Sequence, residues 1–191
     1  MRFHVVRTGP DWDRLRKIFT RLRTWPVDKT AEGIARFLVA RTREGILRGA
    51  PGGKQFNRLA AFTIARKGHD RPLIDTRQLL EALRAERMGQ GRNWSQWYAG
   101  IPADLPHREP RRIAGFTPER LIAIRRTIAR IGAFHEFGFR PSKIQTTRPF
   151  LGPTLESERQ TIEQLAEARL AQWIGLDGPR MPPRSGGIFR V

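Results

Sequence analysis

The chain has 191 residues, the size of one ordinary domain or at most two small ones, and a hydrophobic fraction of 39%, enough to bury a core. Its 36 Lys and Arg residues against 18 Asp and Glu residues give a formal charge of +18 at pH 7, and 31 of the basic residues are arginines. The lack of cysteine excludes disulfides, thiolate metal clusters and a cysteine nucleophile, and no apolar run approaches the roughly 20 residues of a membrane span.

The first quarter of the chain is predicted to be mainly helical. Residues 1–7 have the pattern of a short strand, and apolar residues at three- to four-residue spacing then predict a helix over 11–25. A second helix is predicted to start at Asp28 or Thr30 and to run to residue 48, with an apolar stripe opposite a cationic face. That face contains three candidate contacts for DNA or an acidic partner, Arg36, Arg41 and Arg43.

The middle of the chain mixes helix with strand. Residues 49–54 form a Gly- and Pro-rich breaker that lacks the spacing of a phosphate-binding loop, and residues 55–67 have helical spacing. Asp75 or Thr76 is predicted to cap a further helix that uses leucines 79, 80 and 83. The aromatic-rich stretch 92–101 is predicted to be a strand.

The last part begins with a Pro- and Arg-rich stretch and ends with a long helix. Residues 102–130 are interpreted as an insertion, within which a helix starts near Thr117. A closing helix is predicted over 154–174, and residues 178–191 are expected to be a flexible arm. The predicted fold is α+β, a single domain over residues 1–177 with a small antiparallel sheet packed against amphipathic helices.

The chain shows no pattern typical of a catalytic or metal site. His135-Glu136 begins like a zinc-protease helix, but the second histidine of that motif is replaced by Phe139. No Gly-x-Ser-x-Gly elbow occurs, and no carboxylate stands in a setting that marks it as catalytic. We therefore expect neither enzymatic activity, nor a metal, nor a cofactor.

The positive charge lies in the first three quarters of the sequence. Residues 1–150 carry the whole excess, whereas residues 151–191 hold five basic and five acidic residues. Such a body is attracted to polyanions whatever their sequence, although an arginine-rich composition or contact with acidic protein neighbours explains the charge equally. No base-reading module is present, so readout of a nucleotide sequence is not expected.

Three segments, taken in order, resemble the bacteriophage virion morphogenesis family, also called tail-completion, neck or minor tail proteins. Residues 68–79 (GHDRPLIDTRQL) are similar to that family's Lys-Gly-x-x-Pro-Leu-x-Asp-Thr-Gly-x-Leu signature. Residues 134–138 (FHEFG) resemble an element that lies near a strand end, and residues 147–152 (TRPFLG) resemble the lead into the closing helix. Arg77 departs from the pattern, because the family has glycine there.

These motif residues have roles that elementary chemistry explains, mostly in preserving the fold. Gly138 permits a positive φ, and Arg148-Pro149 sets an extended approach to Phe150, which is expected to be a buried anchor. The full set that the resemblance indicates for fold or assembly is Pro72, Leu73, Asp75, Thr76, Leu79, His135, Glu136, Gly138, Arg148, Pro149 and Phe150.

The resemblance implies a structural subunit that assembles into a ring, most simply a hexamer with a twelvefold ring as the variant, between phage head and tail. Its partners are then the head connector or portal-side proteins, the tail tube or terminator proteins, and the DNA in the channel. It is assembled in the host cytoplasm and located in the virion, with no membrane partner.

A non-enzymatic nucleic-acid-binding protein is the alternative hypothesis, because the net charge and the arginine-rich helix faces favour contact with phosphates. Besides the three arginines of the second helix, the candidate contacts for DNA or an acidic partner are Arg108, Arg111, Arg112, Arg125 and Arg126.

Overall fold

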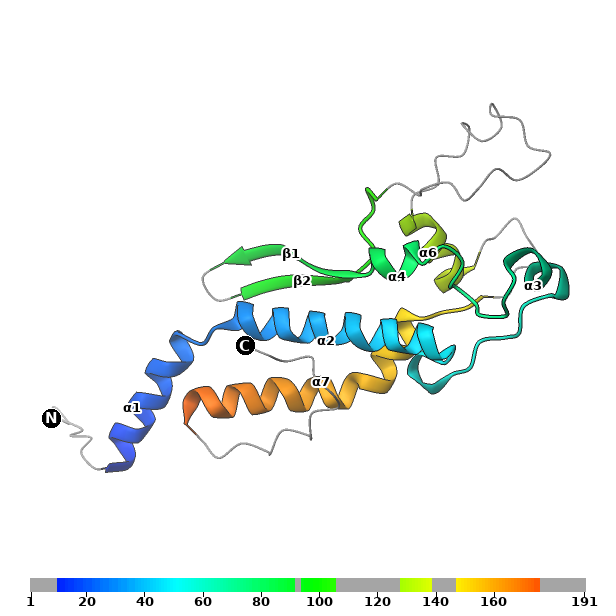
Figure 1. Ribbon diagram of the computed structural model, residues 1–191. Coiled ribbons are helices and arrows are strands. Elements are labelled where there is room, and N and C mark those ends of the chain that lie inside the picture. Colours follow the sequence, from blue (N-terminus) through cyan, green and yellow to red (C-terminus); the bar gives the residue numbers. More distant parts are fainter. Residues whose placement is uncertain (1–9, 92–93, 106–127, 139–146, 176–191) are drawn as a thin grey trace, which may run out of the picture.

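The computed structural model describes residues 10–91, 94–105, 128–138 and 147–175 (Figure 1). Within this part the chain folds into six α-helices and one two-stranded antiparallel sheet, which confirms the predicted α+β class. The strand predicted at 1–7, most of the insertion and the C-terminal arm lie outside the described residues.

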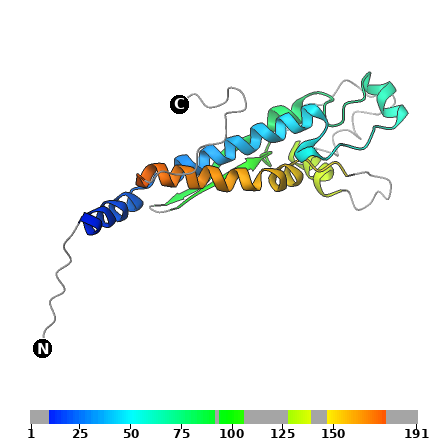
Figure 2. The ribbon, with the colours of Figure 1, turned by 90° about the horizontal axis from the view of Figure 1, so that it is seen from below.

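Two long helices form the frame of the molecule. Helix α2 (Val27–Arg48) and helix α7 (Leu151–Ile174) lie side by side and run in opposite directions (Figures 1 and 2). Both were predicted, and α7 begins three residues before its predicted start. The 3-10 turn η1 (Pro51–Gly53) packs on the start of α7 so closely that a Cβ on Gly52 would lie 2.1 Å from the carbonyl oxygen of Pro153.

A β-hairpin covers the face of α2 opposite α7 (Figure 1). Strand β1 (Arg84–Gly91) pairs with β2 (Trp94–Gly100), with a bulge between Arg87 and Gly89. Only β2 was predicted. The sequence of β1, RAERMGQG, has no aromatic or β-branched residue, so its strand conformation depends on pairing with the aromatic-rich β2.

Asp28, in the first turn of α2, fastens the hairpin to the helix. Its Oδ1 accepts hydrogen bonds from Ser95 Oγ at 2.5 Å and from the indole N–H of Trp97 at 2.9 Å. These two hydrogen bonds, followed by the charge of Arg87, hold the pKa of Asp28 below its ordinary value. These hydrogen bonds therefore hold the start of β2 against the first turn of α2.

Four shorter helices complete the described chain. Helix α1 (Pro10–Arg23) extends from one end of the frame, and α3 (Ala61–Lys67) lies at the other end (Figures 1 and 2). Helices α4 (Gln78–Ala82) and α6 (Ile128–Phe137) pack near α3. The helix predicted over 55–67 was only partly right, because residues 54–60 are not helical and only α3 forms.

The core lies where α2, α4, α6 and the base of the hairpin meet the start of α7. Its most buried side chains are Ile46, Leu83 and Phe150, each exposed by 1% or less. Helix α6 packs so closely here that a Cβ on Gly132 would lie 2.7 Å from Ile101 Cδ1. Phe150 is thus the buried anchor that the sequence predicted, and it brings α7 to the α4–α6 end of the molecule.

Candidate functional site

The junction between α6 and α7 joins two of the three motif segments. The Glu136 carboxylate accepts hydrogen bonds from three consecutive backbone N–H groups at the start of α7, from Phe150 and Leu151 at 2.8 and 3.1 Å and from Gly152 at 2.8 Å. The first N–H groups of a helix have no partner within the helix and carry partial positive charge, so a carboxylate stabilises them well. Glu136 therefore caps the N-terminus of α7, although it precedes Phe150 by fourteen residues in the sequence.

A second contact holds the same two segments together. The backbone N–H of Arg148 donates to the carbonyl of His135 at 2.8 Å. Gly138 follows α6 with φ 84°, the left-handed conformation predicted for it. The element at 134–138 was expected near a strand end, and that expectation was wrong, because it forms the last turn of α6.

The third motif segment, residues 68–79, leads into α4. The prediction that Asp75 or Thr76 caps this helix was wrong, since the cap position belongs to Arg77 and no side chain makes a capping hydrogen bond. Arg77 has φ 59°, a conformation that favours glycine, and Leu73 has φ 60°. Arg77 therefore adopts a tight-turn conformation at the position where the signature that segment 68–79 resembles has glycine. Pro72 is half-buried and precedes this turn.

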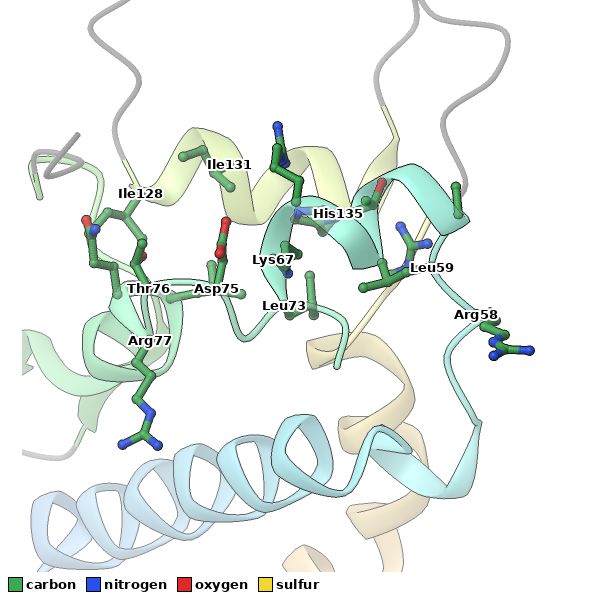
Figure 3. Close-up of a pocket in the computed structure, with 16 residues that line it drawn as sticks. Arg58, Leu59, Lys67, Leu73, Asp75, Thr76, Arg77, Ile128, Ile131 and His135 are labelled. Carbon is green, nitrogen blue, oxygen red and sulfur yellow. The ribbon is translucent and has the colours of Figure 1, made fainter. Parts of the chain in front are cut away.

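A cavity of about 640 Å³ lies between these segments (Figure 3). Its walls come from residues 58–67 on one side, residues 73–79 on another, and α6 with Arg148 on the remaining side. Among the predicted motif residues, those that line it are Leu73, Asp75, Thr76, Leu79, His135 and Arg148. Residues scattered over more than 70 positions of sequence therefore meet at one concave site.

The cavity is strongly basic. Asp75 is the single carboxylate among its lining residues, against the five cations Arg58, Arg66, Lys67, Arg77 and Arg148. Burial is the largest cause that lowers the pKa of Lys67; Asp75 opposes it, and Arg66 and Arg148 lower the pKa further. Burial, then Arg148 and Lys67, lower the pKa of His135 to about 4. At neutral pH His135 is thus an uncharged imidazole inside a cationic cluster.

Two buried polar atoms at this cavity have no hydrogen-bond partner among the described residues, His135 Nδ1 and Arg148 Nε. Buried polar atoms in folded proteins nearly always have a partner. The sequence pattern does not single out Arg66 and Lys67, which complete the cluster, because a basic pair before a glycine is also a common helix end. Their position directly before the first motif segment is the only sequence signal for them.

The arginines predicted on α2 are largely engaged within the chain. Arg41 forms ion pairs with Glu158 of α7 at 2.6 Å and with Glu44 at 2.7 Å. Arg43 donates to the backbone carbonyls of two residues at the end of α4, which fixes α4 against α2. Arg36 is exposed and pairs with Glu32 on its own helix. The other candidate contacts, Arg108, Arg111, Arg112, Arg125 and Arg126, lie outside the described residues.

Helix α1 presents an apolar stripe to solvent. Its members, each exposed by 39% or more, are Trp12, Leu15, Phe19 and Leu22. The helix is connected to the frame near its end, where the indole N–H of Trp173 donates to the carbonyl of Arg21 at 2.8 Å. The spacing predicted an amphipathic helix, and its four apolar side chains remain 39–62% exposed.

The described residues contain no group of three or more His, Cys, Asp or Glu side chains arranged to hold a metal ion. None of the helices in the described ranges is both long enough and apolar enough to cross a bilayer. The chain matches no known protein-family model, and no curated protein or solved structure is significantly similar to it.

Proposed function

We propose that the chain is a structural subunit of a phage neck, a tail-completion ring that joins the tail to the head connector and surrounds the DNA channel. The observation that carries the proposal is the contact between segments 134–138 and 147–152, through the three hydrogen bonds to Glu136. Segment 68–79 faces both across the cavity. Three weak sequence resemblances that meet in one structural unit support a common origin more than three isolated ones do.

The backbone of the motif residues supports the same proposal. Gly138 and Arg77 both have positive φ, and the resemblance places glycine at each of these two positions. An arginine in this conformation is strained by about 1 kcal/mol, so its persistence indicates that the surrounding structure demands the turn.

The apolar stripe of α1 supplies a surface through which copies of the chain can associate. Four large apolar side chains that remain 39–62% exposed on one helix form a surface of the kind that mediates protein association. We assign them to contact with a neighbouring copy, which in a closed ring repeats around the axis. Function then consists of many simultaneous contacts with connector and tail proteins and involves no bond chemistry.

Native mass spectrometry and negative-stain imaging of the purified full chain test this proposal. We expect closed rings, most simply hexamers, alone or with connector and tail proteins. Phe19→Ser on the stripe should shift the population toward monomer, whereas Leu155→Ser, an exposed leucine on α7, should not. A chain that stays monomeric at all concentrations and is absent from purified virions contradicts the proposal.

Nucleic-acid binding is the second candidate, favoured by the net charge of +18. A titration of duplex DNA at increasing salt should give a steep linear fall of log affinity with log salt if several phosphates are contacted. Failure to bind DNA at low salt removes this candidate and leaves the ring proposal intact.

A further inference from the structure

The basic cavity between α3, α4 and α6 has the size and the lining of a ligand site. Its volume of about 640 Å³ falls within the range of roughly 300–1,000 Å³ that is typical of pockets for small molecules. We propose that this cavity binds a small organic phosphate, with Arg66, Lys67 and Arg148 around the phosphate group and His135 as a neutral hydrogen-bonding partner. This proposal does not depend on ring assembly.

The arginines of the cavity differ from most of those of α2 in that they form no ion pair with a described carboxylate and can therefore pair with a ligand. Arg36, Arg41 and Arg48 each pair with a glutamate. In contrast, the structure records no ion pair between the cavity arginines and any carboxylate in the described ranges. Lys67 Nζ reaches the carbonyl of Arg71 at 3.5 Å, which occupies one of its three protons.

Arg66, Lys67 and Arg148 line the same cavity, so they can act on one ligand. In addition to burial, Asp75 raises the pKa of Lys67 while Arg66 and Arg148 lower it, and Arg148 and Lys67 lower the pKa of His135. Three cations beside one carboxylate leave a local excess of positive charge. Figure 3 shows Lys67 and His135 near one another. The guanidinium groups of Arg58 and Arg77 point away from these two side chains.

The unpaired cations indicate an acceptor-rich ligand. A phosphate offers several oxygen acceptors and a single or double negative charge, and guanidinium and ammonium groups are its usual partners. His135 Nδ1 and Arg148 Nε have no hydrogen-bond partner among the described residues, but both atoms are shielded from solvent and lie beneath the cavity surface. One phosphate group therefore matches the unpaired positive charge of the cavity.

The rest of the lining favours an organic body attached to the phosphate. Leucine and isoleucine side chains form much of the wall, among them Leu59, Leu73 and Ile131. Asp75 repels a second anionic group but can accept a hydrogen bond from a hydroxyl or amine of the ligand. The sugar-phosphate backbone of duplex DNA carries no apolar group that could fill the part of the cavity lined by leucine and isoleucine. A small phosphate ester with an organic body therefore fits the cavity better than DNA does.

Isothermal titration calorimetry on the full chain tests the proposal with adenosine 5′-monophosphate, glycerol phosphate, inorganic phosphate and adenosine as probes. We expect at least one of the two esters to bind more tightly than inorganic phosphate, and adenosine to bind at least tenfold more weakly than its monophosphate. Lys67→Gln should weaken ester binding about tenfold or more. Arg159→Gln, which removes the same charge from the exposed face of α7, should leave it within about twofold.

A measurement on the unmutated chain covers the case in which Lys67→Gln does not fold. The imidazole resonance of His135, assigned by its loss in His135→Asn, should shift when the tighter ester is added. The proposal is overturned if no phosphate probe binds, if Arg159→Gln weakens binding as much as Lys67→Gln does, or if the His135 resonance does not respond. It is also overturned if a duplex oligonucleotide binds more tightly than every ester and Lys67→Gln weakens that binding to the same extent. The cavity would then bind the phosphate groups of DNA.

Discussion

The Glu136 carboxylate lies 2.8 Å from the backbone nitrogen of Phe150, fourteen residues further along the chain. This hydrogen bond places the anchor side chain of Phe150 in the core while the same carboxylate caps the helix that follows. One side chain thus fixes both where α7 begins and how α6 sits against it.

Replacing Glu136 tests this cap directly. Glu136→Ala removes an acceptor shared by three N–H groups, so we expect a loss of about 2–3 kcal/mol in the free energy of unfolding, measured by urea denaturation. Glu136→Gln, which keeps one acceptor oxygen, should lose less. Glu163→Ala removes an exposed pair with Arg159 and should cost less than about 1 kcal/mol. Equal losses in Glu136→Ala and Glu163→Ala contradict this role for Glu136.

The ion pair between Arg41 and Glu158 is expected to hold α2 against α7. Glu158 is largely buried, so removing its partner leaves an unpaired carboxylate at the helix interface. Arg41→Ala should reduce the free energy of unfolding by about 2 kcal/mol. Arg36→Ala, at an exposed pair on the same helix, should change it by about 0.5 kcal/mol or less, and thermal melts that show the two variants to be equal would refute the prediction.

The low pKa of His135 makes stability depend on pH. As the pH falls below 6.5 the unfolded chain binds a proton at this histidine, while the folded chain does not until about pH 4. The free energy of unfolding should therefore fall as the pH is lowered from 6.5 to 4, by at most about 3 kcal/mol. His135→Asn should flatten this part of the curve, and an unchanged slope in that variant contradicts the assignment.

The turn at Arg77 offers a substitution that should not destabilise the protein. Arg77→Gly relieves the strain of a left-handed conformation, partly offset by the greater freedom of glycine in the unfolded chain. We expect the free energy of unfolding to rise by up to about 1 kcal/mol. Arg71→Gly, at an exposed position whose φ is not positive, should lower it instead, and a loss in both variants argues against strain at Arg77.

Part of the fold was predictable from simple sequence patterns. Helix α2 is amphipathic along its length, and β2 has a concentration of aromatic residues. Helix α7 was predicted although its apolar periodicity is weak. Strand β1 was not predictable, since its residues have low strand propensity and its conformation comes from pairing. The segment 54–60 has helical spacing yet is not helical, which propensity alone does not reveal.

The candidate site was predictable only in part. The motif segments named Glu136, Gly138 and Phe150, but no sequence pattern shows that Glu136 caps a helix fourteen residues away. The capping role assigned to Asp75 or Thr76 failed because the turn geometry at Arg77 takes that position. The grouping of Arg66 and Lys67 with Arg148 depends on long-range packing, which a local pattern does not record.

His135 and Glu136 are consecutive residues in the last turn of α6, and they serve different neighbours. One lines the cavity, and the other binds the first N–H groups of the 24-residue helix α7. Because a helical turn moves as a unit, any displacement of the cavity wall at His135 is transmitted through a single peptide linkage to the base of α7. We therefore expect a ligand that moves the cavity wall at His135 also to change the position of α7.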